Sequence, residues 1–316
     1  MARLQVLNML IEEHTEEASS SEISWLSMRM NLAYVSVSKS WLSGDIVAAI
    51  LILGIFTGNT AHIDSTTEGT RQYLTPGSVP DEMRRPMNAL SVAASVGIPR
   101  ETARTKIRML EQNGLLTVSS EGVVLSPDAL LFGSLSRVVP GYLAALEEFL
   151  TGLRTLGAYG LSRGRNFSHP FWDIGGAVMR LGTAHVLRTT NAVQALWPDL
   201  PFNTKYTFSS ISHLVGFDLR IEDRMSPDGG ALAPLRPGLS PVSGCDVARF
   251  TGLPEETARR HIRALVDMGA VVRNKQGYDV NLDNHYLLSR WEVLQDRSNT
   301  STRQFVSKLR SAGLLT

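Results

Sequence analysis

Apolar side chains recur at helical spacing in two separate parts of the chain. In each part three apolar residues fall at i, i+4 and i+7, which places them on one face of an α-helix. These residues are Ala103, Ile107 and Leu110 in the first part and Ala258, Ile262 and Leu265 in the second. Charged and polar residues lie between them, so the pattern predicts amphipathic helices over Arg100–Gln112 and Glu255–Asp267.

Turn-forming residues bracket both predicted helices. Gly97 and Gly252 each end a short preceding helix, because glycine adopts the left-handed backbone conformation at low cost. Pro99 and Pro254 suit a helix start, where the missing N–H would have no partner anyway. After each helix, short strands joined by a polar turn predict a hairpin. The predicted hairpin tips are Ser120–Gly122 and Asn274–Gly277.

The two parts align without a gap, Val92 with Val247, at an offset of 155 residues. Twelve aligned pairs in this stretch are identical: Val92/Val247, Ala93/Ala248, Gly97/Gly252, Pro99/Pro254, Glu101/Glu256, Thr102/Thr257, Ala103/Ala258, Arg104/Arg259, Ile107/Ile262, Arg108/Arg263, Leu110/Leu265 and Gly114/Gly269. The offset is about half the chain, which indicates an internal duplication. We therefore expect a mainly α fold with small β-wings, in two repeats over residues 1–160 and 161–316.

Weaker matches extend the repeat in both directions. With one residue inserted, residues near Phe149 match residues near Phe305, so each copy is expected to end in a helix after its hairpin. In the first copy this helix is predicted over Pro140–Leu156, with an apolar face for the core or a subunit interface. Upstream, the residues Trp41, Gly44 and Val47 align with Trp172, Gly175 and Val178.

The repeated string Gly-Ile/Leu-Pro-x-Glu-Thr-Ala-Arg-x-x-Ile-Arg-x-Leu resembles the recognition-helix region of bacterial winged helix-turn-helix transcription regulators. The resemblance covers residues 88–126 and 240–281 and extends to the superfamily only. In such proteins the second helix enters the DNA major groove, and the hairpin, or wing, touches the backbone or minor groove. The resemblance implies a sequence-specific double-stranded-DNA-binding protein that regulates transcription by reading two half-sites.

The candidate DNA contacts are the polar residues of these helices and of the second wing. Arginine can pair with guanine through two hydrogen bonds, and both Lys and Arg neutralise phosphates. The candidates are Arg100, Glu101, Thr102, Arg104, Thr105, Lys106, Arg108, Glu256, Thr257, Arg259, Arg260, His261, Arg263, Arg273 and Lys275. The alternative interpretation is a solvated helix face. Glu255 and Glu256 start the second helix and repel phosphate, so the first helix is expected to supply more affinity.

Composition narrows the possibilities further. The chain has 316 residues, a net charge of +1 and one cysteine, Cys245, so a disulfide framework within the chain is excluded and a cytoplasmic location is expected. The seven histidines are scattered, and no nucleotide-binding or catalytic motif occurs, so we expect no enzyme activity, cofactor or metal. The uncharged run over residues 46–61 is shorter than a membrane span, and a buried or dimer-forming helix is expected there.

Other functions and partners remain open from the sequence. Tandem winged helices also serve as protein-interaction modules in chromosome organisation, and replication initiators also bind DNA through paired winged units. A small-molecule effector is a further candidate partner, and Trp172, Trp197, Tyr206 and Phe208 are candidates for its pocket or for core packing. One chain is expected to imitate a symmetric dimer, and the protein itself is expected to be a monomer or a homodimer.

Overall fold

The computed structural model describes residues 20–126, 135–161, 167–216, 241–281 and 283–315. The first half of the chain contains α2 (Ser20–Ser40), α3 (Ile46–Thr60), α5 (Ala89–Ser95), α6 (Arg100–Gln112), β1 (Leu116–Ser119), β2 (Gly122–Leu125) and α8 (Leu135–Thr155). The second half contains α9 (Phe171–Leu196), α10 (Phe202–Gly216), α11 (Gly244–Thr251), α12 (Glu255–Asp267), β3 (Val271–Arg273), β4 (Tyr278–Val280) and α13 (His285–Ser311). Short helical elements are η1 (Ile63–Ser65), α4 (Thr67–Gln72), η2 (Asp81–Met83) and η3 (Ala158–Gly160).

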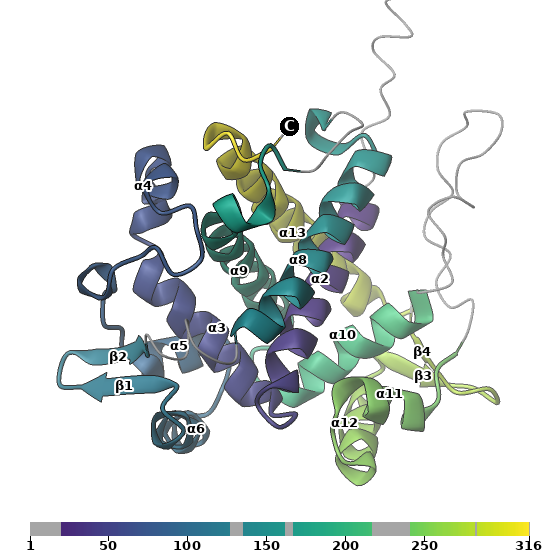
Figure 1. Cartoon of the computed structure of the whole chain (residues 1–316). Helices are drawn as coiled ribbons and strands as arrows, with labels where there is room; N and C mark the ends of the chain where they lie inside the picture. Colours follow the sequence, from purple (N-terminus) through teal and green to yellow (C-terminus); the bar gives the residue numbers. More distant parts are fainter. Residues whose placement is uncertain (1–19, 127–134, 162–166, 217–240, 282, 316) are drawn as a thin grey trace, which may run out of the picture.

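The expected fold class, mainly helical with two small antiparallel hairpins, is confirmed (Figure 1). Helices α6 and α12 have the predicted bounds. In the first hairpin Ser119 pairs with Gly122, so Gly122, which was predicted to belong to the hairpin tip, is the first residue of β2. Helix α8 begins five residues before its predicted start, and Pro140 lies inside it.

The described elements follow the same order in both halves. Helices α3 and α10 are both 15 residues long and begin 156 residues apart, and α6 and α12 begin 155 residues apart. The turn glycines Gly97 and Gly252 have φ angles of 69° and 73°. Each hairpin also forms an antiparallel bridge with the segment before α5 or α11, where Met87 pairs with Val123 and Val242 pairs with Tyr278.

This element order corrects the upstream alignment. Trp41 follows α2, whereas Trp172 lies in the first turn of α9. The residue that follows α9, as Trp41 follows α2, is Trp197. Trp41 therefore corresponds to Trp197, at an offset of 156, and the alignment of Trp41 with Trp172 is wrong.

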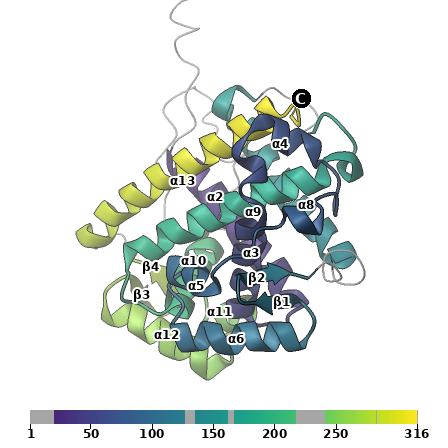
Figure 2. The same cartoon turned by 90° about the vertical axis from the view of Figure 1, so that its left-hand side faces the viewer.

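Four long helices, α2, α8, α9 and α13, form the centre of the molecule (Figures 1 and 2). Ser27 of α2 and Thr302 of α13 share a hydrogen bond of 2.8 Å between their hydroxyls. His185 of α9 stacks between Phe149 of α8 and Phe305 of α13, at 5.3 Å from each ring. The larger hydrophobic cluster thus contains residues from both sides of position 160, so the long helices of the two halves share one core.

Helix α3 accounts for the longest uncharged run of the sequence. Asp45 caps its first turn by accepting a hydrogen bond of 3.0 Å from the Ala48 N–H. The helix from Ala48 to Ile55 is buried among α2, α6 and α9, so its apolar residues serve the core. None of the helices in the described ranges is long and apolar enough to cross a membrane.

Candidate nucleic-acid interface

Helices α6 and α12 lie at the same end of the molecule, at the bottom of Figures 1 and 2. The short helices α5 and α11 precede them, and a hairpin follows each. The two hairpins lie on opposite sides of the molecule in Figure 1. One face therefore presents both helices, with a hairpin at each flank.

The apolar stripes dock these helices as predicted. Ala103, Ile107 and Leu110 are buried, and α6 packs against α3 and α5. Helix α12 uses its own stripe in the same way against α10 and α11. The remaining side of each helix faces solvent, which leaves its polar residues available to a partner.

Most of the predicted contact residues are exposed. These are Arg100, Glu101, Arg104, Thr105 and Arg108 on α6, Glu256, Arg259, Arg260 and Arg263 on α12, and Arg273 and Lys275 on the second hairpin. Thr102 and Thr257 are half-buried at equivalent places. The sequence pattern thus found the outward face of both helices.

The same ion pair forms on both helices. Arg104 contacts Glu101 at 2.6 Å, and Arg259 contacts Glu256 at 2.8 Å, with all four side chains at least half exposed. Exposed ion pairs of this kind contribute only about 0–1 kcal/mol. A phosphate or a base edge can therefore replace the carboxylate at little cost.

Two predicted DNA contacts have partners on the inner side of their helices. Lys106 forms an ion pair with Asp45, the residue that caps α3. His261, at the equivalent place on α12, is buried, and its Nδ1 lies 2.9 Å from the Thr204 hydroxyl of α10. Burial lowers the pKa of His261, which favours the neutral ring. Both residues follow the inner alanine by three positions, so they face the supporting helix and hold the outer helix in place.

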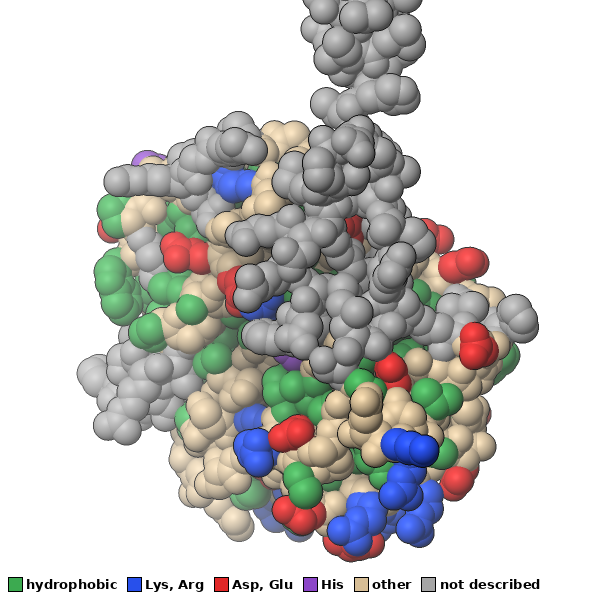
Figure 3. All heavy atoms as spheres, turned by 90° about the vertical axis from the view of Figure 1, so that its right-hand side faces the viewer, with side chains coloured by type: hydrophobic (Ala, Val, Ile, Leu, Met, Phe, Trp, Pro, Cys, Tyr) green, Lys and Arg blue, Asp and Glu red, His purple; other side chains and the backbone are tan. Residues whose placement is uncertain are grey.

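The second hairpin carries the basic tip that the sequence predicted. The Asn274 Oδ1 accepts hydrogen bonds of 2.9 Å from the N–H groups of Gln276 and Gly277, which fixes the turn. A groove of about 320 Å³ between this hairpin, α11 and α12 is lined by Arg259, Arg273 and Lys275 among others. Figure 3 shows Lys and Arg side chains gathered at this lower end of the molecule.

Contacts between the halves buttress the turns that precede α6 and α12. The Lys39 Nζ at the end of α2 donates 2.6 Å to the Phe250 carbonyl, just before the turn at Gly252. On the other side, a Cβ at Gly97 would meet the Gln194 Oε1 of α9 at 2.5 Å, so the turn lies directly on that side chain. Each half thus supports the helix-turn-helix of the other, which fixes the placement of α6 relative to α12.

Lys205 of α10 binds the same Gln194 side chain on which the turn at Gly97 lies. Its Nζ donates 2.6 Å to the Gln194 Oε1, and burial lowers the pKa of Lys205 to about 8. Sequence reasoning missed Lys39, Gln194 and Lys205 as positioning residues. No local pattern distinguishes them, since each acts on a turn far away in the sequence.

The aromatic residues considered for an effector pocket do not all lie in one part of the molecule. Trp197, Tyr206 and Phe208 are buried, whereas Trp172 is 63% exposed and lies elsewhere, so the four do not form one effector pocket. Cys245 is exposed and lines the groove between the second hairpin, α11 and α12. Within the described ranges, no group of three His, Cys, Asp or Glu residues is arranged to hold a metal.

No protein-family model, curated protein or solved structure matches this chain.

Proposed function

We propose that this protein is a sequence-specific double-stranded-DNA-binding protein that regulates transcription. The observation that carries this proposal is the pair of helices α6 and α12 at one end of the molecule, which carry identical residues at four positions outside the apolar stripe. The shared residues are Glu101, Thr102, Arg104 and Arg108 on α6 and Glu256, Thr257, Arg259 and Arg263 on α12. Two like helices on one face suit two half-sites of one duplex.

We infer that the two halves are winged helix-turn-helix units that arose by duplication. The common element order, the paired turn glycines Gly97 and Gly252, and the matching bridges onto each hairpin support this inference. In this arrangement α6 and α12 are recognition helices, and the hairpins are wings. One chain then provides what two subunits provide in a symmetric dimer.

Recognition would divide between two kinds of contact. Arg104 and Arg259 can release Glu101 and Glu256 and bind base edges in successive major grooves, where arginine pairs with guanine. Exposed cations around them, such as Arg273 on the second wing, would neutralise phosphates. With both helices on one face of the duplex, half-site centres are expected about 10–10.5 base pairs, or a multiple, apart.

The salt dependence of binding tests this function. In the double variant Arg104→Ala/Arg108→Ala, affinity for double-stranded DNA should fall at least tenfold, and the slope of log affinity against log salt should become shallower by up to about two units. Fluorescence anisotropy with labelled duplexes measures both quantities. Arg303→Ala, an exposed position on α13, is the matched control and should change neither. Unchanged affinity in the double variant would show that α6 does not contact DNA.

A further inference from the structure

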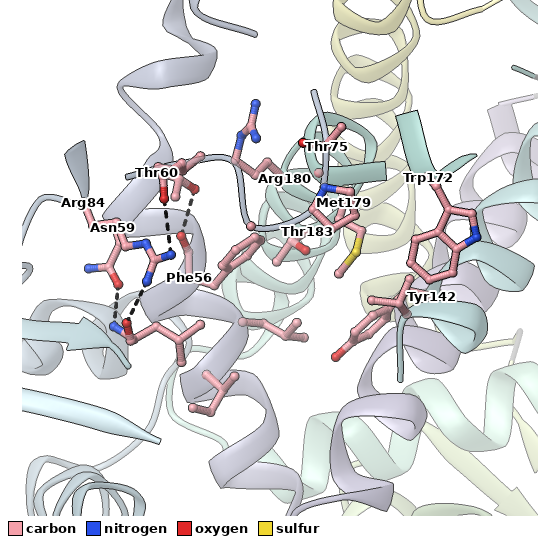
Figure 4. A pocket seen from close by; sticks show the side chains of 18 of the residues that line it. Phe56, Asn59, Thr60, Thr75, Arg84, Tyr142, Trp172, Met179, Arg180 and Thr183 are labelled. Carbon is pink, nitrogen blue, oxygen red and sulfur yellow. Dashed lines mark hydrogen bonds between the residues drawn. The ribbon is translucent and has the colours of Figure 1, made fainter. Parts of the chain in front are cut away.

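A cavity of about 390 Å³ lies in the first half, between α3, α8, α9 and the segment before η2 (Figure 4). Its walls are mainly apolar and include Trp41, Ile52, Leu53, Phe56, Val139 and Met179. Trp172, at the start of α9, also lines it and is 63% exposed, so the cavity is bordered there by a solvent-facing aromatic ring. Protein interiors are otherwise close-packed, and a void of this size is uncommon.

The two arginines and the tyrosine that line the cavity have protein partners. The Arg180 guanidinium donates to both Asp64 carboxylate oxygens, at 2.9 and 3.1 Å. Arg84 contacts Asp81 at 3.2 Å and the Leu125 carbonyl at 3.3 Å. The Tyr142 hydroxyl lies 2.7 Å from the Ser38 hydroxyl, and burial raises the pKa of Tyr142 to about 12. With its cations paired and its tyrosine neutral, the cavity favours an uncharged occupant.

The corresponding place in the second half is filled. The space between α10, α13 and α2 measures only about 50 Å³. Phe208 occupies the position that corresponds to Ile52, at an offset of 156. Its ring packs edge-on against Trp197 at 4.9 Å and against Trp291 at 6.3 Å. The shared element order therefore does not require a void, and the cavity is a property of the first half.

The cavity is connected to the first wing. Leu125 of β2 forms part of its wall, and so does Asn59 of α3. The Asn59 side chain accepts a hydrogen bond of 2.9 Å from the Leu125 N–H and donates one of 3.0 Å to the Val123 carbonyl. A molecule in the cavity would press on the residues that hold β2 against α3.

We propose that this cavity binds an uncharged, mainly apolar small molecule, and that its binding changes the DNA affinity of the first winged unit. The volume lies within the range of about 300–1,000 Å³ typical of small-molecule sites, near its lower end. An aromatic compound of two or three rings suits walls built from Trp41, Phe56 and Met179. The effect on DNA rests on the proposed function, whereas the binding itself does not.

A neutral fluorescent probe, N-phenyl-1-naphthylamine, tests the binding. The wild-type chain should bind it saturably at one site, with enhanced fluorescence. Ile52→Phe, which copies Phe208 of the second half, should lower the affinity at least tenfold. Trp172→Ala changes an exposed side chain, so the fold should be kept, and should lower the affinity at least threefold. Tyr286→Ala removes an exposed aromatic ring outside the cavity and should have no effect.

The outcomes separate the two parts of the proposal. An absence of saturable binding, or equal binding by the folded Ile52→Phe and Trp172→Ala variants, would overturn the ligand site. If the probe binds as expected, adding it should shift the DNA affinity of the wild-type chain at least threefold and leave that of Ile52→Phe unchanged. An unchanged wild-type DNA affinity would overturn the regulatory part. A chain that binds the probe but no duplex would refute the proposed function and leave the ligand site supported.

Discussion

The two halves of the molecule keep the same buried framework and differ in what they expose and enclose. The inner stripes of α6 and α12 are identical, and the turns at Gly97 and Gly252 have matching geometry. On the outer side, Arg100 of α6 corresponds to Glu255 of α12. In the interior, the open cavity of the first half corresponds to an aromatic cluster in the second.

This difference separates the residues that keep the shared framework from the residues that distinguish the two halves. Packing and turn geometry restrict the inner positions, because a change there leaves a void or strains the backbone. Outer positions carry no such restriction. The first half combines an arginine at the helix start with a ligand-sized cavity, and the second combines two glutamates with a basic wing. The halves are thus expected to make unequal contributions to binding and regulation.

The largest expected effect concerns Asn59, which corresponds to the buried Val215 of the second half. Asn59→Val should lower the free energy of unfolding by about 3 kcal/mol, because it leaves the Leu125 N–H and the Arg85 carbonyl without their side-chain partner and removes one of the two hydrogen bonds to the Val123 carbonyl. Urea denaturation measures this loss. A decrease below about 1 kcal/mol would show that the first wing does not depend on Asn59.

The second effect is a pH dependence centred on His185, which corresponds to the half-exposed Arg29 of α2. Burial, with the nearby Arg188, lowers the pKa of His185 to about 3. Its stabilising contribution is therefore present above the unfolded-state pKa of about 6.5 and is lost as the pH falls, by about 2 kcal/mol between pH 6.5 and pH 5. In His185→Gln, the slope of unfolding free energy against pH should decrease by about one proton. An unchanged slope would contradict the buried neutral ring.

Exchanging the helix-start charges tests the inequality of the two recognition helices. Arg100→Glu should weaken DNA binding about tenfold, and Glu255→Arg should strengthen it about tenfold, as one phosphate contact is lost or gained. Titrations of both variants at several salt concentrations measure these shifts. Equal losses from both changes would mean that the two helices approach DNA in different ways.

The smallest expected effect concerns the contact between the halves at Lys39. Lys39→Met removes the hydrogen bond to the Phe250 carbonyl and should destabilise the second helix-turn-helix by about 1 kcal/mol. Amide hydrogen exchange should become faster in α11 and α12, whereas α5 and α6 should be unaffected. Faster exchange in all four helices would show instead that the substitution weakens the shared core.

The sequence predicted the local elements well because their signals are local. The bounds of α6 and α12 followed from apolar periodicity, a preceding proline and a following glycine. The partners of Lys106 and His261 were not predicted, because the apolar stripe alone marked the inner face. A polar residue three positions after the inner alanine also lies on that face. There Lys106 forms an ion pair with Asp45, and His261 lies within hydrogen-bond distance of Thr204.

Contacts over long sequence distances could not be predicted. Helices α2 and α9 differ in their partners, since α2 packs mainly on α8 and α13, whereas α9 packs mainly on α13 and α2. The division into residues 1–160 and 161–316 stays a prediction, and the shared core joins helices from both sides of position 160. The cavity depends on which side chains of α3, α8 and α9 contact one another. The periodicity of apolar residues along the chain does not predict these contacts.

Selection of bound duplexes from random DNA, followed by footprinting, tests the central claim most directly. The account predicts one imperfect palindrome whose half-site centres lie about 10–10.5 base pairs, or a multiple, apart. Arg104→Ala should erase protection on one side and Arg259→Ala on the other, with the larger loss from Arg104→Ala. A lack of any enriched sequence, or a single protected half-site that is indifferent to Arg259, would contradict a paired reading of DNA by α6 and α12.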